Sequence, residues 1–257
     1  MNNLVVLVLI ATIVMLVLGI GIVTFFVLYQ RRIINHQLEI KKITDQKELE
    51  LLQASIQSEE AERKRIAGEL HDDVGVTLSS VRLFLYKADI DAGVLNESRQ
   101  LLDQSIQKIR NISHQLQPDT LLLLGLESSL QSFAATISKS GVLHVQYISA
   151  TALPRLKDNI ELSVYRIVQE LVNNIMKHAN ATGVQILPQI AGDKFFVYLT
   201  HNGQGISNQE FEERIYTKGT TGLKNIVNRI KSVEGTIDFG YANNSYQVTI
   251  AVPAVAK

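Results

Sequence analysis

The run ERKRIAGELHDDVG, residues 62–75, joins the spacing of a half-buried helix to a histidine that stands beside an acid. Apolar residues recur through and beyond this run every three or four positions, which places them along one face of an α-helix. His71 follows Leu70 and therefore lies at the edge of that face, where its side chain can reach solvent, with Asp72 next to it. The members of the apolar stripe are Ile66, Leu70, Val74, Leu78, Val81 and Leu85.

Two glycines, Gly68 and Gly75, flank this histidine along the helix. A glycine inside a helix costs roughly 1 kcal/mol relative to alanine, so the two indicate that another group must approach His71 closely. A neutral imidazole is a competent nucleophile, and a neighbouring carboxylate can fix its tautomer and take its proton. A bare His-Asp pair is more often a surface histidine on a bundle helix, but the surrounding run favours the chemical role.

The run resembles the phosphoacceptor helix of two-component sensor histidine kinases, in the subfamily whose motif is E-x-x-R-I-A-x-E-L-H-D. This resemblance implies that His71 accepts the γ-phosphate of ATP and passes it to an aspartate on a response regulator, with Asp72 as the base. A glutamine or asparagine often follows five positions later in the family and assists dephosphorylation of the regulator, and here that position is Val76. The matching residues are Glu62, Arg65, Ile66, Ala67, Glu69, Leu70, His71 and Asp72.

Composition narrows the class of protein. The chain has 257 residues, enough for one or two modest domains, with 25 basic and 25 acidic side chains. This balance gives no indication of nucleic acid or an acidic partner, and we expect no direct nucleic-acid binding. Cysteine is absent, which excludes disulfides and thiolate metal sites and suits a cytoplasmic body.

The stretch from Leu4 to Tyr29 carries no charged residue. As a helix it reaches roughly 39 Å, enough to cross a hydrocarbon core of ~30 Å with some tilt. A cleaved signal peptide is the alternative, but it needs a basic start, whereas here the basic residues Arg31 and Arg32 come afterwards. We therefore predict a single-pass anchor in the inner (cytoplasmic) membrane, with the N-terminus outside and the catalytic domains in the cytoplasm. Because three residues precede the span, we expect no sensor domain outside.

Residues 30–61 are charged, lack glycine and proline, and predict a signalling helix that links the membrane to the His71 helix. Leu49, Leu52 and Ile56 follow heptad spacing. A plain solvated spacer is the alternative, because four charged residues interrupt the seam. They are Lys42, Asp45, Glu59 and Arg63.

Residues 62–117 predict a pair of helices. The segment 87–97 breaks the pattern and indicates a connection, and a second amphipathic stretch extends from Leu102 to Leu116 before Pro118 ends it. Two such helices cannot bury both apolar stripes alone, whereas two copies form a four-helix bundle. The resemblance implies that this homodimeric bundle is the dimerisation and histidine-phosphotransfer domain.

Residues 118–257 change to an α/β pattern. An apolar run and a helical pattern follow Pro118, and the segment from Leu116 to Leu126 is similar to the L-x-P-x-x-L-x-x-L-G-L opening of the ATPase domain of histidine kinases. Pro188 within a strand indicates an edge or a bulge. We expect strands at 142–148, 184–190, 194–200, 236–239 and 246–252, and helices at 158–180 and 222–233.

The run RIVQELVNNIMKHANAT, residues 166–182, predicts a helix with two faces. Glu170, Asn174, Lys177 and His178 gather on the polar face, and an ordinary solvated face is the alternative for these four. An asparagine amide suits Mg²⁺ bound to a triphosphate, and a lysine one turn later supplies charge for phosphate oxygens. The inward positions are Val164, Ile167, Val168, Leu171, Ile175 and Ala179.

This run resembles the N box of the histidine-kinase and gyrase ATPase superfamily, R-x-x-Q-E-x-x-x-N-x-x-K-H. The resemblance implies that Asn174 carries Mg²⁺, that Lys177 and His178 contact phosphate, and that Glu170 orients water or metal. The nucleotide would be ATP.

Two glycine-rich segments resemble the remaining ATP boxes. HNGQG, residues 201–205, follows a strand, and its glycines Gly203 and Gly205 allow a ligand close to the backbone. The family has aspartate where this chain has His201, and that aspartate accepts a hydrogen bond from the adenine amino group. Residues 207–218 would be the flexible lid.

The second segment, GTTGLKN at 219–225, precedes a helix whose N-terminus favours phosphate. The resemblance assigns Thr221, Gly222 and Leu223 to the nucleotide, although Thr220 replaces the usual first glycine. The final turn of the family is represented by Asn244 and Ser245.

Together these features predict an α plus α/β protein: a transmembrane helix (4–29), a signalling helix (30–61), a dimeric helical-bundle phosphotransfer domain (62–117) and an α/β-sandwich ATPase domain (118–257). We expect a membrane-anchored sensor histidine kinase that uses ATP and Mg²⁺. Its partners would be a second copy, a cytoplasmic DNA-binding response regulator and a membrane partner that supplies the signal. The alternative is a pseudokinase, a dimeric binding module that sequesters a regulator without phosphoryl transfer. A serine kinase acting on an anti-sigma partner shares the ATPase fold but does not need the His71 helix.

Overall fold

A computed structural model of the chain describes residues 2–87, 92–116, 119–149, 153–217, 221–242 and 244–255. The chain divides into two compact units, residues 1–51 and 52–257. Helix α1 (Asn2–Glu69) belongs to both. Pro118, Gly219 and Thr220, which the sequence singled out, lie outside the described residues.

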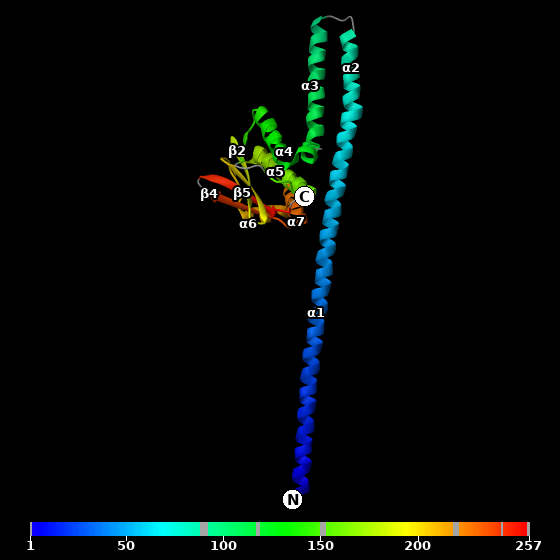
Figure 1. Ribbon diagram of the computed structural model, residues 1–257, viewed down its shortest axis with the longest axis vertical. Helices are drawn as coiled ribbons and strands as arrows, with labels where there is room; N and C mark the ends of the chain where they lie inside the picture. Colours follow the sequence, from blue (N-terminus) through cyan, green and yellow to red (C-terminus); the bar gives the residue numbers. More distant parts are fainter. Residues whose placement is uncertain are drawn as a thin grey trace. The chain divides into compact units, whose positions relative to one another are not determined.

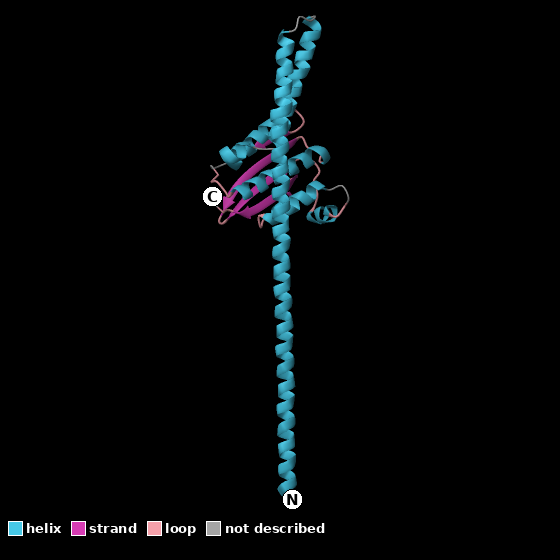
Figure 2. Cartoon of the chain, turned by 90° about the vertical axis from the view of Figure 1, so that its right-hand side faces the viewer, coloured by secondary structure: helices cyan, strands magenta, loops and turns pink. Residues whose placement is uncertain are grey.

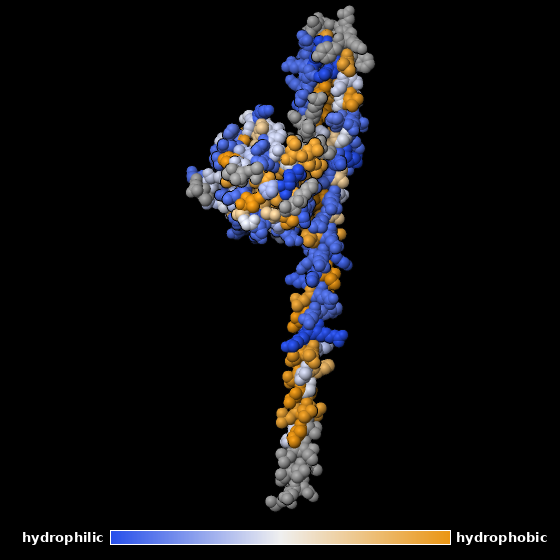
Figure 3. Space-filling view, in the orientation of Figure 1, coloured by the Kyte–Doolittle hydropathy of each residue, from blue (hydrophilic) through white to orange (hydrophobic). Residues whose placement is uncertain are grey.

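The first unit consists of α1 alone. Its described side chains from Ile13 to Tyr29 are largely apolar and exposed, and Figure 3 shows this hydrophobic stretch followed by a hydrophilic one. Two helical stretches among the described residues are long and apolar enough to cross a membrane: one within Met15–Leu83, near the N-terminus, and one at Leu121–Lys139. The second contributes buried side chains to a core, as helices of water-soluble domains do. Both stretches meet the length and composition criteria, and the burial of the second favours a span near the N-terminus.

The second unit begins with a long helical hairpin. A π-helical turn, η1 (Leu70–Val74), follows α1 and leads into α2 (Gly75–Lys87), beside which α3 (Ala92–Leu116) returns (Figure 1). Ser113 donates a hydrogen bond from its hydroxyl to the Ala67 carbonyl at 3.1 Å. The connection predicted at 87–97 is shorter than expected, because α3 already includes residues 92–97. Residues 88–91 lie outside the described part.

Most of the hairpin's apolar stripe is only partly covered within one chain. Ala67 and Ile106 are the buried hydrophobic residues among those described in the hairpin, at 2% and 5% exposure. Val74, Val81 and Leu83 remain exposed although they follow the helical apolar spacing or lie beside it. The prediction that two helices cannot bury their own stripes is therefore confirmed for the described residues.

Helix α4 (Asp119–Lys139) connects the hairpin to the sheet. Its regular geometry is interrupted at Gly125, whose φ of 85° is in the left-handed region that favours glycine. A Cβ at this position would also meet the side chain of Arg155. Leu121 and Leu126, on either side of the interruption, are both buried, so the change of direction brings the two parts of α4 onto one core.

A five-stranded sheet forms the rest of the unit, in the order β1-β2-β3-β5-β4 (Figure 2). The strands are β1 (His144–Tyr147), β2 (Gly183–Ala191), β3 (Lys194–His201), β4 (Thr236–Ala242) and β5 (Ser245–Pro253). The β1–β2 pair is parallel and the others are antiparallel.

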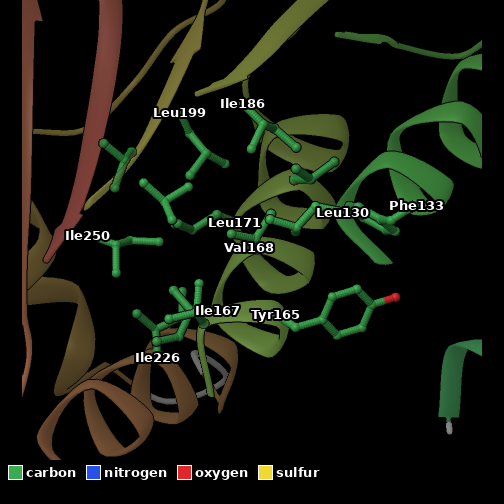
Figure 4. Close-up of a cluster of buried hydrophobic side chains, with 14 of the residues drawn as sticks. Leu130, Phe133, Tyr165, Ile167, Val168, Leu171, Ile186, Leu199, Ile226 and Ile250 are labelled. Carbon is green, nitrogen blue, oxygen red and sulfur yellow. The ribbon is translucent and has the colours of Figure 1, made fainter. Parts of the chain in front are cut away.

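Helices pack on one face of this sheet. Strand β3 buries alternate residues, as expected when one face meets helices and the other meets solvent. Helix α5 (Asp158–His178) lies at the centre of the core, and α7 (Thr221–Ser232) packs beside it. Figure 4 shows α5 side chains such as Ile167, Val168 and Leu171 between strand residues and those of α4 and α7. The sequence-predicted inward face of α5 is confirmed, since all six of its members are buried.

All five predicted strands are present, with ends displaced by up to three residues. Pro188 lies beyond the segment of β2 that pairs with β1, so it occupies an edge, as its missing N–H requires. The segment expected to be the flexible lid, residues 207–218, contains a helix, α6 (Asn208–Ile215), which the sequence analysis did not predict. Ser207 and Glu210 form a capping box at its start, and Phe211 is buried, so this helix is fixed at both its cap and its apolar face.

Candidate active site: the His71 helix and the nucleotide cavity

His71 lies on the π-helical turn with its side chain 71% exposed. Its Nδ1 is 2.9 Å from Oδ1 of Asp72, whose side chain is also exposed. A hydrogen bond from Nδ1–H to this carboxylate leaves the lone pair on Nε2. The predicted pairing is therefore present, and it makes Nε2 the nucleophilic atom.

The π turn was not anticipated from the sequence. The Gly75 N–H donates to the Leu70 carbonyl, five residues earlier, instead of the usual four. Such single turns are frequent at functional sites because they change the direction in which side chains project. Here the wide turn contains His71 and Asp72.

The acidic and basic residues of the motif before His71 form an ion-pair row on the helix surface. The Arg65 guanidinium binds Glu62 through Nε at 2.8 Å and also pairs with Glu69 one turn later. The two glutamates raise the pKa of Arg65. These three residues are occupied with one another, so the structure gives them a helix-stabilising role beside His71.

His71 also lines a cavity of about 250 Å³ between α2 and α3. Val76, Leu83 and Ile106 contribute apolar surface to it, while Ser79 and Ser113 contribute hydroxyl groups. The cavity is therefore a shallow, mainly apolar surface next to an exposed nucleophile.

A second and larger cavity, of about 560 Å³, lies at the end of α5. It brings together eight of the ten residues that the sequence assigned to nucleotide binding, from three separate segments of the chain. They are Glu170, Asn174, Lys177, His178, His201, Gly205, Gly222 and Leu223.

Asn174 has the strongest indication of a ligand. Its side chain lines the cavity, and its Nδ2 is buried without a hydrogen-bond partner. An unsatisfied buried amide costs about 1–3 kcal/mol, so a ligand or water that pairs with it is favoured. Among the described residues, no cluster of three His, Asp, Glu or Cys side chains could hold a metal ion. The unpaired Nδ2 is a donor that suits a phosphate oxygen, and the amide Oδ1 is the atom that would face Mg²⁺, which needs few protein ligands.

His201 ends β3 and is 4% exposed. Its ring stacks on Tyr246 of β5 at a centroid distance of 5.8 Å, and its Nδ1 is buried without a hydrogen-bond partner. Burial lowers the pKa of His201. The ring is therefore neutral at pH 7, with one nitrogen as donor and the other as acceptor.

The glycines of this region allow close packing. A Cβ on Gly222, at the start of α7, would collide with the Glu170 carboxylate, and one on Gly205 would collide with the Tyr246 ring. Gly203 does not line the cavity, because it packs against the Ala179 carbonyl and the Ala181 nitrogen. Thr221, at the first position of α7, does not line it either.

The sequence did not identify three other residues that line the cavity, Gln204, Arg214 and Tyr246. Arg214 lies in the last turn of α6, where the capping-box pattern from Ser207 to Glu210 could have indicated a helix. Tyr246 comes from β5 and lies 45 positions after His201 in the chain. Only the strand register, which places it opposite His201, brings it to the cavity.

The two parts of the chain that match known families correspond to these two sites. Residues 62–121, which contain His71 and Asp72, match the family described as histidine kinase. Residues 159–255, which contain all ten predicted nucleotide residues, match the histidine kinase-, DNA gyrase B- and HSP90-like ATPases. The chain belongs to the two-component sensor histidine kinases.

Several curated proteins are similar to this histidine kinase. The oxygen sensor histidine kinase NreB of Staphylococcus carnosus is 32% identical over 211 residues, which are 79% of this chain and 59% of that protein. The kinase/phosphatase DegS of Brevibacillus brevis is 27% identical over 68% of this chain and 47% of its own. The kinase/phosphatase UhpB of Salmonella typhimurium is 26% identical over 79% of this chain and 41% of its own. The chain thus spans about half the length of these relatives.

The two sites of this histidine kinase are separate in the structure. His71 lines a cavity with residues of α2 and α3, and none of the residues that line the nucleotide cavity lines it as well. A ligand in the larger cavity would therefore reach His71 only after a rearrangement or from a second copy of the chain.

Proposed function

We propose that this chain is a membrane-anchored, homodimeric sensor kinase that phosphorylates its own His71 from ATP and passes the phosphoryl group to a response-regulator aspartate. The observation that carries the proposal is the cavity that gathers eight predicted nucleotide residues, in the same chain as an exposed histidine paired with a carboxylate. Neither feature alone distinguishes a kinase from a binding module.

In the proposed reaction, His71 Nε2 attacks the γ-phosphorus of ATP, the bond to the β-phosphate oxygen breaks, and ADP leaves. The imidazole that forms the new N–P bond carries a proton on Nδ1, and Asp72 at 2.9 Å stabilises or accepts it. Positioning supplies most of the acceleration in such transfers, because the attacking and leaving groups must be in line. Mg²⁺ would neutralise charge on the phosphate oxygens, and Asn174 would hold it.

We assign the remaining groups of the cavity by their chemistry. Lys177 and His178 are exposed at the end of α5, where cationic side chains reach phosphate oxygens. Glu170 lies against Gly222 and would orient water or metal, while Thr221, Gly222 and Leu223 begin α7, whose N-terminus favours phosphate. Gly203 would act indirectly, by fixing the loop that follows His201.

Two further parts of the proposal concern assembly. The exposed apolar stripe of α2 and α3 would be covered by the same helices of a second copy, which forms a four-helix bundle. The apolar stretch of α1 would span the cytoplasmic membrane once, with Arg31 and Arg32 on the cytoplasmic side. We keep the divisions at 4–29, 30–61, 62–117 and 118–257 as the working domain boundaries.

The test uses the full-length chain in detergent or lipid nanodiscs, with Mg²⁺ and labelled ATP. We expect acid-labile, base-stable phosphate on the wild type and none on His71→Ala. His36→Ala, an exposed histidine of the same helix, is the matched control and keeps the label. Label that persists in His71→Ala would show that the phosphoacceptor is another residue.

One observation favours a second candidate, the pseudokinase. A neutral His201 stands where the family has an aspartate, so the charge-assisted contact to adenine is absent. Equilibrium binding of ATP to the wild type and to His201→Asp separates the two functions. If neither protein binds ATP, the chain is a binding module that sequesters its regulator.

A further inference from the structure

Two adjacent acids of α1, Glu59 and Glu60, contact the sheet-containing part of the second unit. Both precede the segment that matches the histidine kinase family, which begins at residue 62. They face two arginines, Arg166 of α5 and Arg229 of α7, whose side chains are only 5% and 4% exposed. We call these four residues the α1 clasp.

Arg166 makes the hydrogen-bonded contact of the clasp. Its Nε donates to Glu60 Oε1 at 3.0 Å and its Nη2 to Glu60 Oε2 at 2.8 Å, which is a two-point guanidinium–carboxylate contact. Nη2 also donates to the Leu116 carbonyl at the end of α3, and Nη1 donates to Gln169. One guanidinium thus connects α1, α3 and α5.

Arg229 completes the clasp through charge. Its Nη2 lies 2.7 Å from Glu60 Oε1 and 3.3 Å from Glu59 Oε1, without the alignment of a hydrogen bond. Burial alone raises the pKa of Glu59, but a hydrogen bond from Arg63 and the charge of Arg229 outweigh it and lower that pKa. Glu59 therefore keeps its negative charge at neutral pH, and the two carboxyl groups of the clasp face two buried guanidinium groups.

The two clasped helices are the helices that frame the nucleotide cavity. Arg166 lies one turn before Glu170 and two turns before Asn174 on α5, and both of these line the cavity. Helix α7 begins at Thr221, places Gly222 and Leu223 at the cavity and carries Arg229 near its other end. Glu170 lines the nucleotide cavity and also a crevice of about 200 Å³ that contains Glu59, Arg166 and Arg229. The clasp and the cavity are therefore directly adjoining.

The clasp is also separated from His71 along the helix. Glu60 precedes His71 by eleven residues, about 16 Å along a helix. A phosphoryl donor must come within roughly 3–3.5 Å of the attacking atom, whereas His71 and the nucleotide cavity share no lining residue here. Holding both framing helices against α1 keeps the donor at its own cavity.

We propose that the α1 clasp restrains the kinase, and that Glu59 and Glu60 must separate from Arg166 and Arg229 before His71 is phosphorylated. The proposal explains why charged Glu59 interrupts the apolar seam of the signalling helix: its carboxylate serves the contact with α7. Rotation or displacement of α1 by a signal would remove the acids from both arginines at once. A buried arginine that loses its carboxylate is strongly disfavoured. Helices α5 and α7 would therefore separate from α1 together, and water would hydrate the two exposed guanidinium groups.

The first experiment removes the negative charge of the clasp. Glu59→Gln/Glu60→Gln keeps side-chain size, and we expect the initial rate of His71 phosphorylation at saturating ATP to rise at least threefold. ATP affinity should stay within twofold, because neither residue lines the nucleotide cavity. The control, Glu48→Gln/Glu50→Gln, changes the same charge on exposed positions of the same helix and should keep the wild-type rate. An unchanged or lower rate in the clasp variant would refute the proposal.

The second experiment does not depend on kinase activity. The chain has no cysteine, so Glu60→Cys/Arg166→Cys provides a unique pair for a short, reducible bis-methanethiosulfonate cross-linker. We expect a cross-link within one chain, seen as a monomer with altered mobility on a denaturing gel. The linked protein should lose at least nine-tenths of its phosphorylation rate, and reductant should restore it.

The outcomes separate this inference from the proposed function on which it rests. A cross-link that does not form refutes the clasp, and a linked protein that phosphorylates His71 at the unlinked rate refutes the restraint. If His71 is unphosphorylated in every variant, including reduced ones, the kinase proposal fails and the cross-link alone decides whether the clasp exists.

Discussion

The helical hairpin around His71 and the sheet part around the nucleotide cavity bury their residues to very different extents. In the hairpin, His71 is 71% exposed and Val76 is 61% exposed, and the apolar stripe is only partly covered within the chain. In the sheet part, His201 and the core of α5 are almost fully buried. The first region is thus left open for other molecules, whereas the second is a site that one chain completes by itself.

This difference has a physical reason. A nucleophile that must meet a nucleotide and then a regulator needs access from several directions, so its helix cannot surround it with packed side chains. A cavity that holds one small ligand gains from being formed in advance, because ordering its walls on binding would cost free energy. Substitutions in the sheet part should therefore change the free energy of unfolding and the affinity for ATP. Substitutions in the hairpin should change the rates of phosphorylation and of transfer to the regulator.

The largest effect is expected at Gly203. Alanine there would collide with the Ala179 carbonyl and the Ala181 nitrogen, both backbone groups that cannot move away cheaply. We expect Gly203→Ala to lower the free energy of unfolding of the sheet part by about 3 kcal/mol. Thermal denaturation followed by circular dichroism measures it, and Gly240→Ala, where a Cβ meets nothing within 4 Å, is the control. Equal melting temperatures for both variants would show that this loop is not closely packed.

His201→Asp should have the next largest effect, on affinity. A carboxylate would accept from the adenine amino group with full charge, and we expect ATP to bind about five- to thirtyfold more tightly, or 1–2 kcal/mol. From sequence alone, wild-type binding should weaken as the pH falls through the ordinary histidine pKa of about 6.5. The structure corrects this, because burial lowers the pKa of His201 and the neutral ring persists below that pH.

Calorimetric titration of ATP between pH 5 and 8 measures both quantities. Wild-type affinity should hold at pH 6.5 and decline only in more acidic solution, while His201→Asp should show no such decline near neutrality. A wild-type affinity that already falls between pH 7.5 and 6.5 would mean that the ring is more hydrated than the structure indicates.

Gly68→Ala should have a smaller effect, and one of opposite sign on stability. No atom lies within 4 Å of a Cβ at this helical position, so alanine should raise helix stability by roughly 1 kcal/mol. If the glycine is there so that a second molecule can approach His71, the same variant should slow phosphorylation or transfer to the regulator. Melting temperature and transfer rate measured together test this. A more stable protein with unchanged rates would show that a second molecule can approach His71 without a glycine at position 68.

The smallest effect is expected at Val76, which is exposed and lines the cavity beside His71. Valine offers no hydrogen bond to a water molecule, so we expect weak phosphatase activity toward the phosphorylated regulator. Val76→Gln should shorten the lifetime of the regulator's phosphate without changing the melting temperature. In the alternative, Val76 only packs, and another group such as Thr77 assists dephosphorylation of the regulator. A short lifetime with the wild-type protein would favour it.

Sequence periodicity predicted most of the fold correctly. The long helix through His71, the second helix to Leu116, the five strands and both faces of α5 follow from local spacing, because each element buries one face against a core. Helix α6 was not predicted although Ser207 and Glu210 form a capping box, because glycine-rich segments on either side are more typical of a loop. The early start of α3 was missed because Gly93 and Asn96 are usual in turns but are tolerated in a helix.

The sequence by itself determined which residue types the two candidate sites contain: a histidine beside an acid on an amphipathic helix, and the amide, cations and glycines that line the larger cavity. These depend on residue type and short-range spacing, which folding does not alter. Only the tertiary structure decided that Tyr246 stacks on His201, that Asn174 keeps an unpaired amide in the cavity, and that Glu59 and Glu60 meet Arg166 and Arg229. These contacts join residues 45 to more than 160 positions apart or depend on burial, and no local pattern encodes either.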